Sequence, residues 1–126
     1  MTLQWAGGIN NIGDIIMSIQ DERDYCVIYC TSPTKETALT LSDRLVSLKL
    51  AACVNIIDTI SSIYRWKGEI CRETEFLMVI KSRKSLIEHI EREIREHHPY
   101  EVPEIIALSL AWGHDPYLRW IDENTM

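Results

Sequence analysis

The sequence lacks any block of lysine and arginine residues. It contains 13 basic and 19 acidic residues, for a formal net charge of -6 at pH 7. Proteins that bind nucleic acid or an anionic membrane through charge gather Lys and Arg into a patch. In the one densely charged stretch, residues 91–96, Glu and Arg alternate, which is typical of a solvated helix face. We therefore expect no nucleic-acid partner.

The sequence also lacks paired-cysteine motifs, an export signal and a long apolar run. No CxxC spacing, typical of zinc knuckles and thioredoxin-like redox sites, occurs among its four cysteines, Cys26, Cys30, Cys53 and Cys71. The first residues contain no basic segment, and no apolar run approaches the roughly 20 residues that span a bilayer. These features predict reduced thiols, a cytoplasmic location and no membrane insertion.

The length and the hydrophobic content predict a single domain. A chain of 126 residues with 46% hydrophobic residues can close a core without disulfides. We expect that domain at residues 24–126. Residues 1–23 differ from it, because glycines and asparagines interrupt them before isoleucines recur at helical spacing. We expect this N-terminal extension to be either a short helix or a disordered leader.

Residues 24–66 predict a strand, a helix and a long second strand. The run from Tyr25 to Thr31 is apolar and β-branched, as in a strand covered on both faces. Ser32 is expected to cap a helix that has Pro33 at its first position and continues to about Leu50. The long strand is expected at residues 53–66, where the apolar residues of one parity are Val54, Ile56, Ile60, Tyr64 and Trp66.

The remaining residues predict a third strand, a second helix, a fourth strand and a short terminal helix. Lys67-Gly68 forms a turn, so residues 70–81 pair with the preceding strand as a hairpin. Ser85 and Glu88 form a capping box, and the helix they begin must end before Pro99. Residues 105–110 form the fourth strand, and Asp115-Pro116 begins the terminal helix. The fold class is therefore α+β, a ferredoxin-like β-α-β-β-α-β order in which two helices cover one face of an antiparallel four-stranded sheet.

The predicted hairpin is too long for a lone subunit of this size. A strand of about 13 residues spans about 40 Å, whereas a compact domain of this length has a radius of gyration of about 13 to 14 Å. The tip of the hairpin must overhang its own core. We expect partner subunits to cover it.

Four segments carry a family resemblance. They are residues 30–33 (CTSP), 50–56 (LAACVNI), 64–70 (YRWKGEI, leading to Glu75 and Lys81) and 98–105 (HPYEVPEI). With the terminal YLRWI at residues 117–121, they span residues 24–121, and the HPY to PE string is the most specific. In these positions the chain resembles the CutA divalent-cation-tolerance family. Residues 1–23, Cys26 and Cys71 match nothing in its pattern.

The resemblance implies an assembly and a biological role. It implies a homotrimer of ferredoxin-like subunits, similar in architecture to the PII signalling proteins. It also implies a link to tolerance of copper and other divalent cations in bacteria, whereas animal members are associated with membrane anchoring of acetylcholinesterase. The copper-binding positions of the family map onto Cys30, His97 and His98.

The predicted metal site has a purely structural alternative. Thiolate and imidazole are suitable donors for copper or zinc, and two or three ligands leave a position open for exchange. However, a histidine in the last turn of a helix can cap free carbonyls, and a cysteine in an apolar strand is usually a small buried hydrophobe. Adjacent histidines also point about 100° apart on a helix. Both interpretations remain open for Cys30, His97 and His98.

Other residues are candidates for a ligand cleft or for a subunit interface. The aromatic candidates are Tyr64, Trp66 and Trp112, and the polar ones are Glu75, Lys81, Glu101 and Glu104. A nucleophile and base pair of Cys30 and His97 lacks a third orienting residue, so we expect no enzyme. Two hypotheses follow: a trimeric protein that binds copper or another divalent cation, and a PII-like module that binds a small molecule or a protein partner.

Overall fold

The sheet of this protein is built around a central strand that pairs on both sides. In the computed structural model, which describes residues 24–126, β1 pairs antiparallel with β3 and with β4, and β2 pairs with β3. The strand order is β2-β3-β1-β4. The bounds of the elements are β1 (Tyr25–Ser32), α2 (Lys35–Ser47), β2 (Cys53–Trp66), β3 (Glu69–Arg83), the 3-10 turn η1 (Lys84–Leu86), α3 (Ile87–His97), β4 (Ile106–Ser109) and α4 (Asp115–Glu123). This order confirms the predicted ferredoxin-like fold class; the prediction for residues 1–23 lies outside the described residues.

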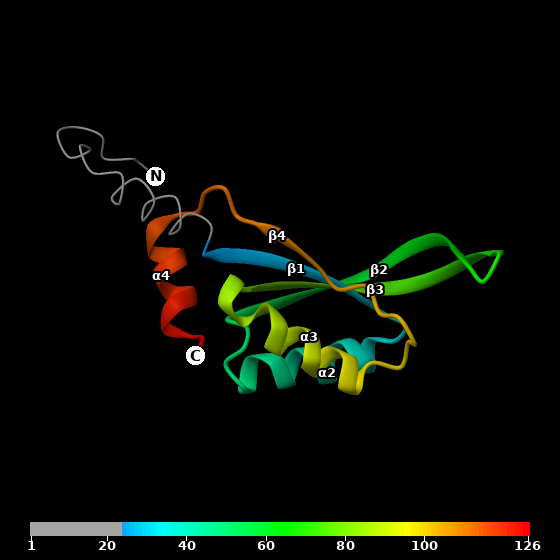
Figure 1. Cartoon of the computed structure of the whole chain (residues 1–126), viewed down its shortest axis with the longest axis horizontal. Coiled ribbons are helices and arrows are strands. Elements are labelled where there is room, and N and C mark those ends of the chain that lie inside the picture. The colour runs from blue at the N-terminus through cyan, green and yellow to red at the C-terminus, as the bar shows by residue number, and fades with distance from the viewer. Residues whose placement is uncertain (1–23) are drawn as a thin grey trace.

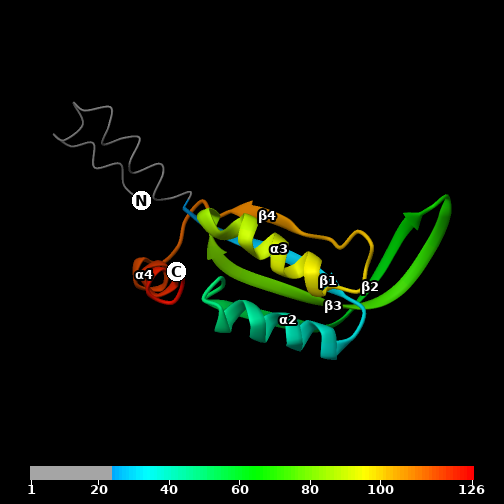
Figure 2. The ribbon, with the colours of Figure 1, turned by 60° about the horizontal axis from the view of Figure 1, so that its bottom comes forward.

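Helices α2 and α3 lie side by side on one face of the sheet, and the β2–β3 hairpin extends well beyond them (Figures 1 and 2). The core lies between these helices and the sheet. Its strand residues alternate, because every second side chain of a strand points to the same face. The most buried members are Cys26, Ile28 and Cys30 of β1, Met78 and Ile80 of β3, Ala38, Leu41 and Leu45 of α2, and Ile90 and Ile94 of α3.

Both helix starts differ from the prediction. Thr34, rather than Ser32, caps α2, since its hydroxyl accepts a hydrogen bond from the Thr37 N–H at 3.1 Å. Ser32 instead donates its hydroxyl to the Thr34 carbonyl. The predicted capping box of Ser85 does not form, because residues 84–86 make a 3-10 turn and α3 begins at Ile87 without a side-chain cap.

The end of α2 also comes earlier than the prediction. The helix ends at Ser47, and Lys49 adopts a left-handed conformation with φ of 60°. The N–H groups of Leu50 and Ala51 then donate to the Leu45 carbonyl, which closes the helix end. Glycine is the usual residue at such a position, so a lysine there gave no stop signal.

Within residues 24–126, neither α2 nor α3 covers the other face of the sheet. Strand register places on it the alternate residues of β1, β3 and β4 that point away from α2 and α3, among them Val27, Tyr29, Val79, Ile106 and Leu108. Ile106 is 52% exposed and Leu108 is 46% exposed. We call this surface the open face.

Candidate functional site

A cleft of 650 Å³ lies where the hairpin leaves the core. Three parts of the chain form its walls: Thr31 at the end of β1, hairpin residues between 62 and 75, and the loop 99–104 that follows α3. These parts are distant in sequence, and the sheet register brings them together. The cleft therefore depends on the whole fold rather than on one motif.

A β-bulge decides which side chains of the hairpin face this cleft. Asp58 pairs with Phe76, but Ile60 pairs with Glu75, so β2 has one extra residue at this point. An extra residue reverses the alternation of the strand beyond it. Val54 and Ile56 pack on the core, whereas Tyr64 and Trp66, which have the same parity, share the face of Glu75. These four residues are all even-numbered, but because of the bulge they do not lie on the same face of the sheet.

The turn of the hairpin fixes the register beyond the bulge. Lys67 has φ of 50° and Gly68 has φ of 83°, so both central residues of the two-residue loop are left-handed, which matches the twist of paired strands. Trp66 then pairs with Glu69, and Tyr64 pairs with Cys71. The ammonium of Lys67 lies 5.6 Å from the centre of the Trp66 ring, within the range of a cation–π contact.

A chain of hydrogen bonds links the floor of the cleft to the end of α3. The Tyr100 hydroxyl donates to the Glu75 carboxylate at 2.8 Å, and the Tyr100 N–H donates to His98 Nδ1 at 3.0 Å. Since Nδ1 accepts, Nε2 carries the proton, and it donates to the Thr31 carbonyl at 2.7 Å. The His98 and Tyr100 rings also pack together, with centroids 4.8 Å apart.

The cleft carries a concentrated negative charge. Glu75 is only 5% exposed. Burial, and then the hydrogen bond to Glu75, raise the pKa of Tyr100, so its hydroxyl keeps its proton and remains a donor. Burial, and then the charge of Glu75, raise the pKa of Glu104. Glu101 is a third carboxylate on the wall.

The cleft brings together five of the seven side chains that we predicted for a cleft or an interface, namely Tyr64, Trp66, Glu75, Glu101 and Glu104. The other two lie elsewhere. Lys81 pairs with Val27 and Cys53 near the base of the sheet, and Trp112 is 71% exposed between β4 and α4. Tyr100 and Lys67 also line the cleft, although neither was among the predicted site residues. The HPY string placed Tyr100 beside the histidines, but its contact with Glu75 is long-range.

The three predicted metal ligands do not meet within this chain. Cys30 is fully buried in the core, and burial, then Glu104 and Glu75, raise the pKa of its thiol to about 12, which disfavours the thiolate that binds metals. Both ring nitrogens of His98 already have partners. His97 makes a separate contact, with Nδ1 at 2.9 Å from the Glu93 carbonyl. The predicted ligand set is therefore not found, and a metal-binding role for any of these residues stays a prediction.

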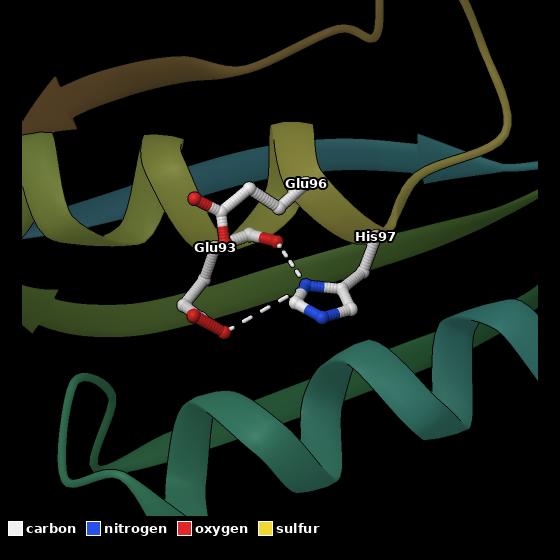
Figure 3. A group of neighbouring side chains, drawn as sticks. All are labelled: Glu93, Glu96 and His97. Carbon is white, nitrogen blue, oxygen red and sulfur yellow. Dashed lines mark hydrogen bonds and ion pairs between the residues drawn. The ribbon is translucent and has the colours of Figure 1, made fainter.

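His97 belongs instead to a different group of possible ligands. Within residues 24–126, Glu93, Glu96 and His97 of α3 form the one group of three His, Cys, Asp or Glu donors that lie within 4.8 Å of one another (Figure 3). The group is partly exposed, and Arg44 of α2 competes for it, since Arg44 donates to Glu93 Oε1 at 2.7 and 3.0 Å. An imidazole with two carboxylates suits an exchangeable divalent metal.

Comparisons with known proteins agree with one another. The family model of the CutA1 divalent ion tolerance protein matches residues 26–124. The divalent-cation tolerance protein CutA of Thermus thermophilus is 42% identical over 99 residues, which are 79% of this chain and 96% of that protein. The chloroplastic CutA of Arabidopsis thaliana is also 42% identical over 79% of this chain, but the chain spans only 54% of its length.

Solved structures show the same fold. The Cut A1 structure from Thermus thermophilus has a TM-score of 0.79 at 41% identity and covers 81% of this chain and 99% of its own. A periplasmic CutA structure from Archaeoglobus fulgidus has a TM-score of 0.78 at 39% identity and covers 79% of this chain and 97% of its own. No helix within residues 24–126 is long and apolar enough to cross a membrane. The chain belongs to the CutA1 divalent-ion tolerance family, as the match over nearly all of its described residues demonstrates.

Proposed function

We propose that this protein acts in tolerance of divalent cations as a cytoplasmic homotrimer that binds a metal ion reversibly and is not an enzyme. Membership of the CutA1 family supports the link to divalent cations. The exposed apolar surface supports the assembly, because Ile63 and Ile70 of the hairpin are 68% and 57% exposed in one subunit and the open face is apolar as well. Monomeric proteins rarely leave large apolar patches in water.

Light scattering after size exclusion should give three times the mass of the chain. Leu108→Glu should shift the protein to a smaller species, because a charge on the open face opposes burial against a second sheet. Leu39→Glu on α2 is the matched control, since Leu39 is 47% exposed and Leu108 is 46% exposed. A trimer that survives Leu108→Glu would exclude β4 and the open face from the interface, and a monomeric wild type would contradict the assembly.

We place the metal at the end of α3, with His97 as its principal ligand. The observation that carries this placement is the grouping of Glu93, Glu96 and His97 within 4.8 Å. Copper is our first choice and zinc our second, because both accept imidazole with carboxylate ligands. Three protein donors leave further coordination positions of the metal open. Arg44 must also release its hydrogen bonds to Glu93 before Glu93 can bind the metal. We therefore expect a site that exchanges its ion.

Titration calorimetry with copper(II) and zinc(II) should show binding by the wild type that His97→Ala weakens by at least about 10-fold, the loss that even an outer-shell change can produce. His89→Ala, which removes another exposed histidine of α3, and Cys30→Ala should bind as the wild type does. Arg44→Gln should bind more tightly, because a competing cation is gone. A loss with both His97→Ala and Cys30→Ala would return the site to the family's copper positions. Equal affinity in all variants would remove both sites.

The cleft favours a second function, binding of a small molecule, in which the metal site is incidental. The supporting observation is the buried carboxylate of Glu75 in a cleft of 650 Å³. Binding clefts of such volume usually combine apolar walls with a few convergent polar groups. Tyr64, Trp66 and Tyr100 supply the walls here, and Glu75 and Glu104 supply the polar groups.

A further inference from the structure

Glu75 is a buried carboxylate with no cationic partner in the described chain. It is 5% exposed, it accepts a hydrogen bond from Tyr100, and no Lys, Arg or His within residues 24–126 forms an ion pair with it. Proteins normally pair a buried charge, because removing it from water is costly. The Tyr100 hydroxyl donates one of the hydrogen bonds that the Glu75 carboxylate can accept, but it brings no positive charge. A cation from outside the subunit would complete this site.

The walls around Glu75 suit a cation that has an apolar body. Tyr64, Trp66 and Tyr100 line the same cleft as Glu75. Trp66 already receives a cation, since the Lys67 ammonium lies 5.6 Å from its ring centre. An aromatic face attracts ammonium groups through its quadrupole and attracts their carbon atoms through dispersion. A ligand ammonium could therefore contact an aromatic ring and a carboxylate in one cleft.

A metal ion or an anion fits this cleft less well. Neither Glu75 nor Glu104 belongs to a group of three His, Cys, Asp or Glu donors within 4.8 Å in residues 24–126, so the cleft holds no preformed cage of such donors. Its volume of 650 Å³ lies within the range of pockets that bind small organic molecules. Three glutamates and one lysine line it, which gives it a negative potential that repels anions.

We propose that this cleft binds a small organic ammonium ion, with Glu75 as its counter-charge and Trp66 as its aromatic contact. The inference rests on the second proposed function and names its ligand class. Lys67 is then an internal competitor that occupies the Trp66 ring when the ligand is absent. Its removal should favour a cationic ligand and disfavour an anionic one.

The test uses two probes of similar size and opposite charge, n-butylammonium and butyrate, titrated into the full ¹⁵N-labelled chain. The indole N–H signal of Trp66, assigned with Trp66→Phe, should shift with n-butylammonium at millimolar concentration and not with butyrate. Glu75→Gln should weaken n-butylammonium by about tenfold or more, which corresponds to about 1.4 kcal/mol. Lys67→Met should strengthen it. Glu91→Gln, which removes an exposed charge of α3, should change nothing.

Several results would overturn the inference. Binding of butyrate alone, with weaker binding by Lys67→Met, would make the ligand an anion and would keep only the general binding function. A response to neither probe would remove the inference and leave the second function without support. If Glu75→Gln dissociates the trimer in light scattering and n-butylammonium does not bind the wild type, a neighbouring subunit occupies the cleft. Melting of each variant, measured alongside, separates loss of binding from loss of fold.

Discussion

His98→Ala should lower the free energy of unfolding by about 2 to 4 kcal/mol without any metal present. His98 is 8% exposed, and its ring joins the Thr31 carbonyl to the Tyr100 N–H. Alanine leaves both backbone groups without their partner, and each buried polar group that loses its hydrogen bond costs about 1 to 3 kcal/mol. The loss of the ring against Tyr100 adds to this cost. Tyr100 would also be released from one of the contacts that hold it against Glu75.

Urea unfolding at a fixed protein concentration, with a chelator present, measures this effect. His97→Ala is the matched control, because His97 is exposed and contributes one hydrogen bond to the Glu93 carbonyl. We expect the control to change stability by less than about 1 kcal/mol. Equal losses in the two variants would contradict the structural role of His98. A loss that appears only when copper is added would make His98 a ligand.

Ile90→Ala should lower the free energy of unfolding by about 2 to 5 kcal/mol. Ile90 of α3 is fully buried in the core between the helices and the sheet. Alanine removes three carbon atoms from water-excluded packing and leaves a cavity, because neighbouring side chains relax only in part. The same helix carries His97 and precedes His98. Its position therefore also determines where the proposed metal site and the His98 hydrogen bonds lie.

The same urea titration measures this loss, with His89→Ala as its control. His89 is the preceding residue of α3 but is exposed, so we expect a change within about 0.5 kcal/mol. A loss below about 1 kcal/mol for Ile90→Ala would mean that Ile90 is not packed as described. A comparable loss for His89→Ala would mean that this face of α3 is covered in the assembly.

Local patterns in the sequence were sufficient for the order of the elements. The long strand was predicted at its observed bounds, residues 53–66, because β-branched residues and the Lys67-Gly68 turn are signals within a few positions. Helix ends were less predictable. Thr34 and Ser32 are both good caps, and only the backbone around them decides which hydroxyl meets a free N–H.

The predicted metal ligands show the limit of local patterns most clearly. Residue types that suit copper occur at positions 30, 97 and 98, and the family resemblance points to them. Whether these side chains can bind a metal depends on their burial and on their hydrogen-bond partners. The spacing of residues in the sequence reveals neither. The Nε2 atom of His98 is already hydrogen-bonded to the Thr31 carbonyl, which lies 67 residues away in the sequence. Cys30 is buried in the core. The exposed group with Glu93 and Glu96 depends on where α3 ends.

By itself, the sequence determined the fold class, the family and a hairpin too long for one subunit, because periodicity, turns and motifs act over short separations. Only the tertiary structure decided that a bulge near Asp58 turns Trp66 toward Glu75 rather than toward the core. It also decided that Tyr100 reaches Glu75. Both outcomes depend on pairing between distant strands and loops, so the cleft and its charge are properties of the folded chain.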